Sequence, residues 1–302
     1  MAHIIADLKR AFDRGSIFVQ LIYINVGVFL AGALLNIAMR LFQYGEPGLL
    51  QRILALPASP ARLLRSPWTA VTYMFEHADL LHILFNMLWL YGFGSLFLNF
   101  FSARHLRGLY LFGGLVGGVT FLLAYNIFPL FAGEQDYATL VGASASVLAI
   151  VVATAYREPD YPIRLFVLGS VRVKYLALVV IALDLISVTS SNAGGHIAHL
   201  GGALAGWWFA ASLRKGRDLT AWINWALDRL AALFSHETWT RKPRMKVHYG
   251  EGRGDRQRDY DYNARKKEEA DEVDRILDKL KQSGYESLTA EEKKRLFDAS
   301  KR

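Results

Sequence analysis

The feature that most constrains this chain is a series of apolar segments long enough to lie in a lipid bilayer. The first covers about 17–42, and a transmembrane helix needs about 20 predominantly apolar residues. Further apolar segments follow at about 80–100, 106–128, 139–156, 173–190 and 195–213. Backbone polar groups must be paired inside hydrocarbon, so such segments fold as helices. The sequence therefore predicts an all-α polytopic membrane protein with a bundle of six transmembrane helices.

Composition supports this prediction and separates the two ends of the chain. Hydrophobic residues make up 53% of the 302 residues, more than is usual in a soluble domain of this size. Charge gathers after Ser212, where 22 of the 35 Lys and Arg and 17 of the 27 Asp and Glu lie. The net charge of +8 suits an anionic lipid surface, and we expect the bilayer, not nucleic acid, as the partner. No cysteine is present, which excludes a disulfide framework and a thiolate nucleophile.

These patterns divide the chain into five parts. Residues 214–236 carry apolar side chains at helical spacing, which predicts an amphipathic helix on the membrane surface. The region after it is rich in glycine and charge, as linkers are. Thr289 and Glu292 have capping-box spacing in the last part. The predicted parts are an N-terminal cytoplasmic segment, a six-span domain, the amphipathic helix, a charged linker and a small helical hairpin, at 1–16, 17–213, 214–236, 237–264 and 265–302.

The loops between the spans predict the orientation. Arg104 and Arg107 lie between the second and third spans, and the loop at 157–174 is also basic, whereas 131–138 is acidic. Basic residues in short loops mark the cytoplasmic side, so both termini are expected in the cytoplasm. The first loop, about 43–79, mixes arginines with aromatic and aliphatic residues and is expected to lie in the membrane surface. Without a cleavable signal or targeting segment, the pattern suits a bacterial plasma (inner) membrane.

A serine and a histidine inside these spans are candidates for chemistry, because polar groups in hydrocarbon are costly. Ser144 lies in the stretch VGASASVLAI and His199 in HIAHLGGALAG. A serine hydroxyl needs a base within hydrogen-bond reach to act as a nucleophile. Gly202 and Gly206 share a helical face with His199, and small residues let helices approach closely. With Gly142 beside the serine, we expect these glycines to support helix packing that brings Ser144 and His199 together.

A second pair, His82 and Asn86, lies four residues apart and so on one helical face. Both can donate a hydrogen bond, as can the backbone N–H of Ser144, and three donors would suit a developing oxyanion. The alternative is an interhelical hydrogen bond with a structural role.

Together these motifs resemble the rhomboid family of intramembrane serine proteases over about residues 17–213. The resemblance is carried by Gly142-Ala143-Ser144, by His82 with Asn86, by the pattern AHxxGxxxG from Ala198 to Gly206, and by the order of six spans. It implies a Ser144–His199 dyad without a third catalytic acid, and an oxyanion hole from His82, Asn86 and the Ser144 amide. It also implies hydrolysis of peptide bonds in or next to transmembrane helices of membrane-protein substrates through an acyl-enzyme, without a cofactor.

Three positions depart from the family's usual pattern. Ala145 follows the serine where glycine is usual, and Leu148 replaces an aromatic residue that often packs against the histidine. A frequent Trp-Arg pair in the first loop is Trp68-Thr69 here. None of these changes removes a reacting group, but the packing of His199 is expected to differ.

Other polar residues in the spans are expected to lie outside the catalytic set. Ser146 competes with Ser144 as nucleophile but points roughly 200° away around a helix. His196 is expected to contact water or the chain end. Asp184, inside the fifth span, could orient His199 or instead be neutral or bonded to a neighbour, and it stays outside the catalytic set. We expect no metal site, since His196 and His199 have no nearby acid or further histidine to complete one.

Two other functions fit parts of the pattern. A catalytically silent relative would bind membrane clients, but the presence of all four site residues disfavours it. A transporter using ionisable groups would be expected to show repeated discontinuous helices, which the sequence lacks. We therefore predict a serine-type endopeptidase.

Overall fold

The computed structural model describes residues 12, 15–45, 48–165, 169–234 and 253–299. They fall into two compact units, Met1–Thr238 and Trp239–Arg302. Most of the predicted N-terminal segment, and residues 235–252, lie outside the described residues.

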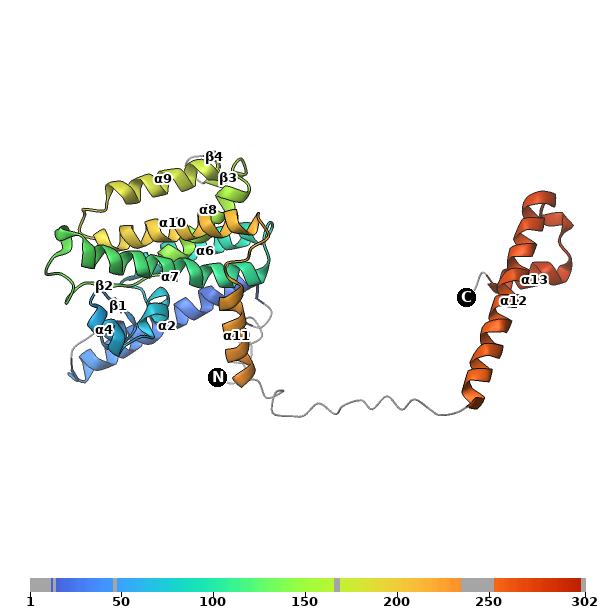
Figure 1. The fold of residues 1–302 in the computed structure, drawn as a ribbon, viewed down its shortest axis with the longest axis horizontal. Coiled ribbons are helices and arrows are strands. Elements are labelled where there is room, and N and C mark those ends of the chain that lie inside the picture. The colour runs from blue at the N-terminus through green and yellow to red at the C-terminus, as the bar shows by residue number, and fades with distance from the viewer. Residues whose placement is uncertain (1–11, 13–14, 46–47, 166–168, 235–252, 300–302) are drawn as a thin grey trace. The chain divides into compact units, whose positions relative to one another are not determined.

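The first unit is a bundle of apolar helices that run side by side (Figure 1). Among the described residues, three helices are long and apolar enough to cross a membrane: α2 (Ile17–Leu41), α6 (Leu80–Phe97) and α7 (Ala103–Ile127). Packed with them are α8 (Ser144–Arg157), α9 (Val173–Ile186) and α10 (Ala193–Leu213). The prediction of a largely helical chain with several apolar helices is confirmed. The number of helices that cross the membrane stays a prediction.

The start of α8 differs from the expected span at 139–156. Thr139–Leu140 form a short strand, β2, paired antiparallel with β1 (Leu56–Pro57). Gly142 then adopts a positive φ of 119°, a conformation that glycine takes without steric cost. The strand pairing and this turn delay the helix until Ser144.

The first loop is structured and contacts α7. Its elements are α3 (Leu49–Leu54), β1, α4 (Pro60–Arg65), α5 (Thr69–Thr72) and the short helix η1 (Tyr73–Phe75). The Tyr73 hydroxyl donates to the Gly114 carbonyl at 2.6 Å, and the Asn126 amide donates to the Ala58 carbonyl at 2.9 Å. These bonds attach the loop to the helix that lies at the centre of the bundle.

The core is formed where α7, α8 and α10 meet, and it is built from small residues. A Cβ at Gly113 would lie 2.5 Å from the Ala149 methyl, and one at Gly117 would lie 2.7 Å from the Ala145 methyl. Only glycine permits such close helix contacts, which dispersion forces favour in a lipid environment. The resulting packing holds the first turn of α8 between two neighbours.

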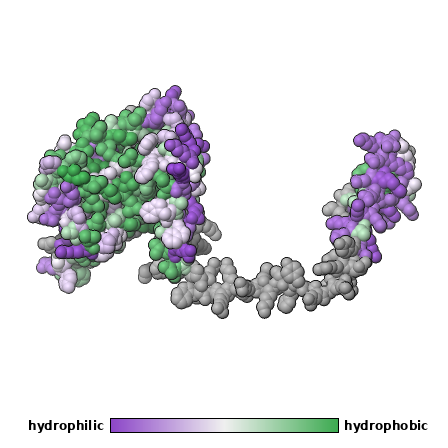
Figure 2. Space-filling view, viewed as in Figure 1, coloured by the Kyte–Doolittle hydropathy of each residue, from purple (hydrophilic) through white to green (hydrophobic). Residues whose placement is uncertain are grey.

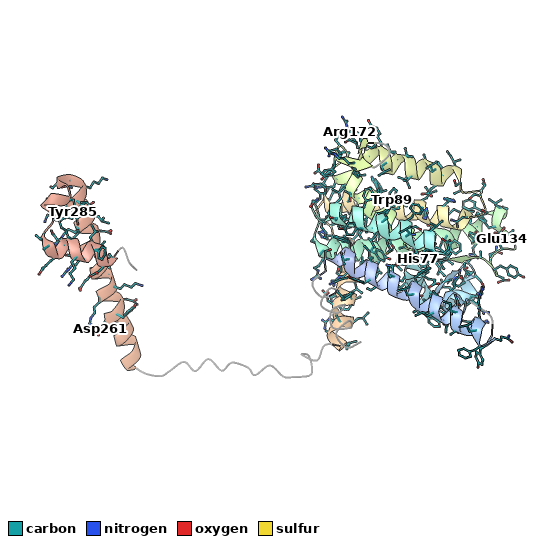
Figure 3. All side chains as sticks on the ribbon, turned by 180° about the vertical axis from the view of Figure 1, so that it is seen from behind. His77, Trp89, Glu134, Arg172, Asp261 and Tyr285 are labelled. Carbon is teal, nitrogen blue, oxygen red and sulfur yellow. The ribbon has the colours of Figure 1, made fainter. Side chains whose placement is uncertain are left out.

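The surface of this unit is apolar around its middle. Figure 2 shows a broad hydrophobic area with hydrophilic residues towards its edges. Large exposed apolar side chains include Leu34, Leu84, Leu88, Leu123 and Ile186. Figure 3 shows Arg172 and Glu134 at opposite ends of the helices. An apolar surface of this kind is unusual for a soluble monomer and fits a membrane protein.

Shorter elements complete the first unit. The hairpin β3 (Pro162–Leu165) and β4 (Gly169–Arg172) joins α8 to α9, and η2 (Pro129–Phe131) follows α7. The helix α11 (Ala221–Phe234) contacts α7. Asp228 accepts hydrogen bonds from Arg104 and Arg107, each at 2.8 Å, which fixes α11 near the first turn of α7.

The second unit is a helical hairpin of α12 (Arg253–Ser283), η4 (Tyr285–Ser287) and α13 (Ala290–Ala299). Helix α12 begins inside the predicted linker 237–264, because a charged helix without apolar periodicity leaves no hydrophobic pattern in the sequence. The capping box is confirmed: the Thr289 N–H donates to Glu292 Oε2 at 2.7 Å, and the Glu292 N–H donates to Thr289 Oγ1 at 3.3 Å. The bond from the Thr289 N–H, helped by Lys279, lowers the pKa of Glu292 to about 2.

Candidate active site

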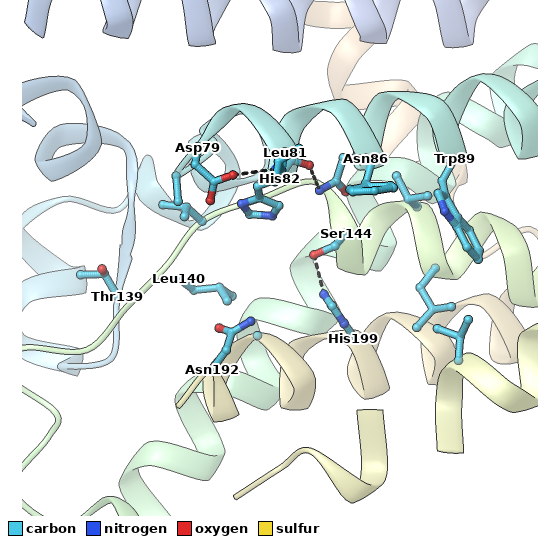
Figure 4. Close-up of a pocket in the computed structure, with 17 residues that line it drawn as sticks. Asp79, Leu81, His82, Asn86, Trp89, Thr139, Leu140, Ser144, Asn192 and His199 are labelled. Carbon is cyan, nitrogen blue, oxygen red and sulfur yellow. Dashed lines mark hydrogen bonds between the residues drawn. The ribbon is translucent and has the colours of Figure 1, made fainter. Parts of the chain in front are cut away.

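A cavity of about 710 Å³ opens among α6, α8, α9 and α10 (Figure 4). Its apolar wall includes Phe85, Trp89, Leu148 and Val180. Its polar lining comprises Asp79, His82, Asn86, Thr139, Ser144, Asn192 and His199. All four residues that the sequence singled out for chemistry therefore border one cavity.

Ser144 is the first residue of α8. The N–H groups in the first turn of a helix have no intrahelical acceptor, and the helix dipole favours negative charge there. The preceding turn is fixed because the Gly142 N–H donates to the Tyr73 carbonyl at 2.9 Å. The serine thus lies at a helix end that is suited to hold an anion.

His199 reaches Ser144 because α8 and α10 touch almost backbone to backbone. A Cβ at Gly202 would collide with the Ala145 carbonyl, and one at Gly206 with the Ala149 carbonyl. With that approach, His199 Nε2 lies 2.6 Å from Ser144 Oγ. The structure therefore joins by a hydrogen bond two residues that lie 55 positions apart.

His82 and Asn86 lie across the cavity on α6. Asp79 caps this helix by accepting from the His82 N–H at 2.9 Å, and the Asn86 amide nitrogen donates to the His82 carbonyl at 2.9 Å. This bond orients the Asn86 side chain. Because an amide nitrogen carries two hydrogens, its second N–H remains available as a donor.

Gly142 lies in the turn that precedes α8. A Cβ built on it would lie 2.7 Å from His82 Nε2 and 3.7 Å from Ser144 Oγ. Its missing side chain leaves room for the His82 ring of α6 beside the serine.

Sequence reasoning left the contacts of Asp184 open, with orientation of His199 as one alternative. Its Oδ1 lies 2.8 Å from the Nδ1 atoms of both His196 and His199. The side-chain ligand atoms of these three residues lie within 4.8 Å of one another. The argument that no acid lies near the two histidines was therefore wrong. His196, expected at water or the chain end, bonds to this carboxylate.

Other residues that the sequence analysis discussed have varied surroundings. Ser146 is fully buried, with its backbone close to Gly113, and does not line the cavity. Ala145 packs under Gly117 and Gly202, and Leu148 lines the cavity. In the first loop, the Trp68 indole donates to the Ile53 carbonyl at 2.9 Å, and the Thr69 hydroxyl donates to the Ser66 carbonyl at 2.7 Å.

Just before α6, Glu76 and His77 are both buried. The His77 ring meets the His82 ring edge-on, with centroids 5.0 Å apart. Burial, with a smaller contribution from His82, lowers the pKa of His77 to about 4, and burial raises the pKa of Glu76. The His77 ring therefore packs against the first turn of the helix that carries His82.

The fold and the site together define a helical membrane protein with a hydrogen-bonded serine and histidine beside an internal cavity. The model of one family, described as the rhomboid domain, matches residues 64–216, just over half of the chain. The protein belongs to the rhomboid family, in which intramembrane serine proteases are the general type. Residues 257–302 match a family of unknown function (DUF6576).

Two relatives share part of this chain. The Arabidopsis thaliana protein named RHOMBOID-like protein 12, mitochondrial, is 31% identical over 158 residues, which are 49% of this chain and 47% of the relative. The Danio rerio protein named presenilin-associated rhomboid-like protein A, mitochondrial, is 30% identical over 156 residues, 51% of this chain and 38% of the relative. The chain thus spans less than half the length of either relative.

The predicted location is contradicted by these relatives. Both are named as mitochondrial proteins, whereas the sequence predicted a bacterial plasma membrane with cytoplasmic termini. Net charge and cysteine content do not distinguish one membrane from another, and loop charge reports only the orientation relative to a membrane.

Proposed function

We propose that this protein is an intramembrane serine endopeptidase that cleaves peptide bonds in or next to transmembrane helices of membrane-protein substrates. The observation that carries the proposal is the 2.6 Å hydrogen bond between Ser144 Oγ and His199 Nε2 beside a cavity in a rhomboid domain. A serine becomes nucleophilic when a neighbouring base accepts its proton.

In the proposed reaction, Ser144 Oγ attacks the carbonyl carbon of the scissile peptide bond while His199 Nε2 takes the hydroxyl proton. The tetrahedral intermediate collapses, and His199 returns that proton to the leaving amine, which leaves an acyl-enzyme. A water molecule, deprotonated by His199, then hydrolyses the ester and regenerates Ser144. The steps are those expected of a serine and a single histidine base.

The negative oxygen of the intermediate would be held by His82, Asn86 and the backbone N–H of Ser144. Support comes from the free donor on Asn86, from the closeness of His82 to Gly142 and from the helix end at Ser144. Such donors accelerate a reaction because they are oriented before the charge develops.

The length of α8 supports a site below the membrane surface. Its 14 residues extend about 21 Å at 1.5 Å per residue, whereas the hydrocarbon core is about 30 Å thick. We propose that α2 and α6 to α10 form six membrane-embedded helices and that α8 begins inside the bilayer. The non-helical backbone at 141–143 then borders the cavity, as required of irregular backbone at membrane depth.

The helix that follows the bundle also has a proposed position. The Arg104 and Arg107 bonds to Asp228 support α11 as a helix at the membrane surface. The names of both relatives make a mitochondrial membrane the compartment to test first, by fractionation of cells that express a tagged full chain.

The activity is tested with purified full-length protein in liposomes and a model transmembrane substrate that has a small residue near one end of its helix. Wild type is expected to cleave it, whereas Ser144→Ala and His199→Ala lower the rate by at least about 10⁴-fold. Ser146→Ala is the matched control, since it removes a buried hydroxyl two residues away that has no hydrogen-bond partner among the described residues, and it retains activity.

A fluorophosphonate probe provides a second readout, because it labels an activated serine without a peptide substrate. Labelling of wild type and not of Ser144→Ala would support the assignment. Absence of both cleavage and labelling in folded wild type would contradict the proposal and favour a relative that binds membrane clients without cutting them.

A further inference from the structure

The strongest unexplained feature of the bundle is a carboxylate behind the catalytic histidine. Asp184 belongs to α9, is 5% exposed, and points its Oδ1 at the Nδ1 atoms of His196 and His199, each at 2.8 Å. The opposite nitrogen of His199 faces Ser144 Oγ at 2.6 Å. Carboxylate, imidazole and hydroxyl thus form one continuous chain of hydrogen bonds.

This chain of bonds determines which nitrogen of His199 carries a proton. A carboxylate oxygen only accepts, and its lone pairs allow two donors. Both imidazoles therefore present Nδ1–H to Asp184. The Nε2 atom of His199 then holds a free lone pair directed at the serine proton, which is the tautomer that a general base needs.

We propose that Asp184 is a positioning residue that completes a Ser144–His199–Asp184 triad, with His196 as the second donor that holds the carboxylate in place. The inference rests on the proposed function and goes beyond the two-residue dyad that the family resemblance implies. When Nε2 takes the serine proton, His199 becomes an imidazolium, and the facing carboxylate stabilises that charge. His199 holds the proton until it passes it to the leaving amine. Asp184 is not protonated at any step, and none of its covalent bonds forms or breaks.

The contact of His196 with Asp184 compensates for the burial of the carboxylate. A buried carboxylate is costly unless hydrogen bonds compensate for its lost hydration. The second oxygen of Asp184, Oδ2, is buried and has no hydrogen-bond partner among the described residues. The two imidazole donors on Oδ1 therefore provide the compensation within the described structure. They also join the end of α9 to the start of α10.

The variant that tests the proposal is Asp184→Asn, which keeps the size of the side chain and removes its charge. We expect kcat to fall by about 10²–10⁴-fold, since the same change in a serine-protease triad leaves the geometry intact but gives the wrong tautomer. KM is expected to change little. Asp160→Asn is the matched control: its carboxylate pairs with Arg172 and Lys174 outside the cavity, and it should retain wild-type kcat.

A spectroscopic readout separates positioning from a merely structural role. In full-length protein labelled with ¹⁵N-histidine in micelles, the ring-nitrogen shifts report which nitrogen is protonated, and His199→Gln assigns the signal. Wild type is expected to show His199 protonated at Nδ1. Asp184→Asn is expected to lose that single tautomer while its unfolding midpoint stays near that of Asp160→Asn.

Three results would overturn the triad. The first is a wild-type protein in which His199 is protonated at Nε2. This measurement on wild type does not depend on whether a variant folds. The second is an Asp184→Asn protein with near wild-type kcat, or with lower kcat and an unchanged tautomer. The third is loss of wild-type activity in EDTA, which would make the cluster of Asp184, His196 and His199 a metal site. Each is distinct from failure of the proposed function, in which Ser144→Ala would cleave like wild type.

Discussion

Two polar networks in the described part of the bundle differ in whether all their hydrogen-bonding groups have partners. In the first, the Asn25 amide donates to the Tyr110 hydroxyl at 3.1 Å and Tyr110 donates to the Met74 carbonyl at 3.0 Å. Asn25 and Tyr110 are both 0% exposed. The second network joins Ser144 and His199 beside the cavity.

The difference separates structural from chemical polarity inside an apolar bundle. The Asn25–Tyr110 network links α2, α7 and the first loop, and none of its members lines the cavity. At the other site, the His199 side chain is 22% exposed, and Asn86 keeps a free donor. A closed network contributes to stability, whereas an open one keeps groups available for a substrate. Substitutions in the two networks should therefore affect different quantities.

The largest expected difference concerns Asn86. Replacing it with alanine removes one proposed oxyanion donor, and such a loss typically lowers kcat by about 10²–10³-fold. KM and the unfolding midpoint should change little, because the lost bond to the His82 carbonyl is local to one helix. Steady-state kinetics on the transmembrane substrate measure both parameters.

Asn126→Ala is the control for Asn86→Ala. Asn126 makes the same bond to the carbonyl four residues earlier, at 2.8 Å to Leu122, and a second one to Ala58, but it does not line the cavity. We expect this variant to lower the unfolding midpoint and to leave kcat unchanged. Equal losses of kcat in the two variants would contradict the division into open and closed networks.

A smaller effect is expected from Tyr110→Phe in the closed network. The change deletes one hydroxyl and leaves the Asn25 side chain and the Met74 carbonyl without that partner. Interhelical hydrogen bonds in membrane proteins average about 0.6 kcal/mol, and an unsatisfied buried group costs about 1–3 kcal/mol. We expect the free energy of unfolding in detergent to decrease by about 0.6–3 kcal/mol. The kcat per folded molecule should be unchanged. A drop in kcat without loss of stability would show that this network also serves the chemistry.

The sequence alone predicted one of these networks better than the other. Small residues beside Ser144 and His199, the four-residue spacing of His82 and Asn86, and the family resemblance allowed the meeting of these residues at one cavity to be anticipated. Asp184 could not be assigned, because its contact depends on how α9 and α10 pack and no spacing encodes it. The partner of Asn25, Tyr110, lies 85 positions away, and no local pattern points to it.

Local structure set a second limit on prediction. Hydrophobic periodicity located the apolar helices, but it missed the pairing of Leu56 with Leu140 and so began α8 too early. It also missed the first turns of α12, where charged residues form a helix without an apolar face in the sequence. The position of Ser144 at a helix end therefore became visible only in the folded chain.

A pH-dependent effect is expected at His77, which lies between the two networks. This residue follows Met74 of the closed network by three positions, and its ring contacts His82 of the open one. Its pKa is about 4 in the folded protein, lowered from 6.5 mainly by burial. As the pH falls from about 6.5 to 4, His77 becomes protonated in the unfolded chain but stays neutral in the folded chain. Stability therefore falls, by at most about 1.4 kcal/mol per pH unit, and the contribution is constant above that window.

The test compares unfolding midpoints of wild type and His77→Gln across this pH range in detergent. Glu76 opposes His77, because its raised pKa makes the folded chain keep a proton that the unfolded chain releases as the pH rises above 4.5. Both proteins contain Glu76, so the difference between their pH profiles isolates the histidine. We expect the profile of His77→Gln to be flatter on the acid side. Parallel profiles would mean that His77 is protonated equally in both states and that the end of α6 is more open to water than its burial indicates.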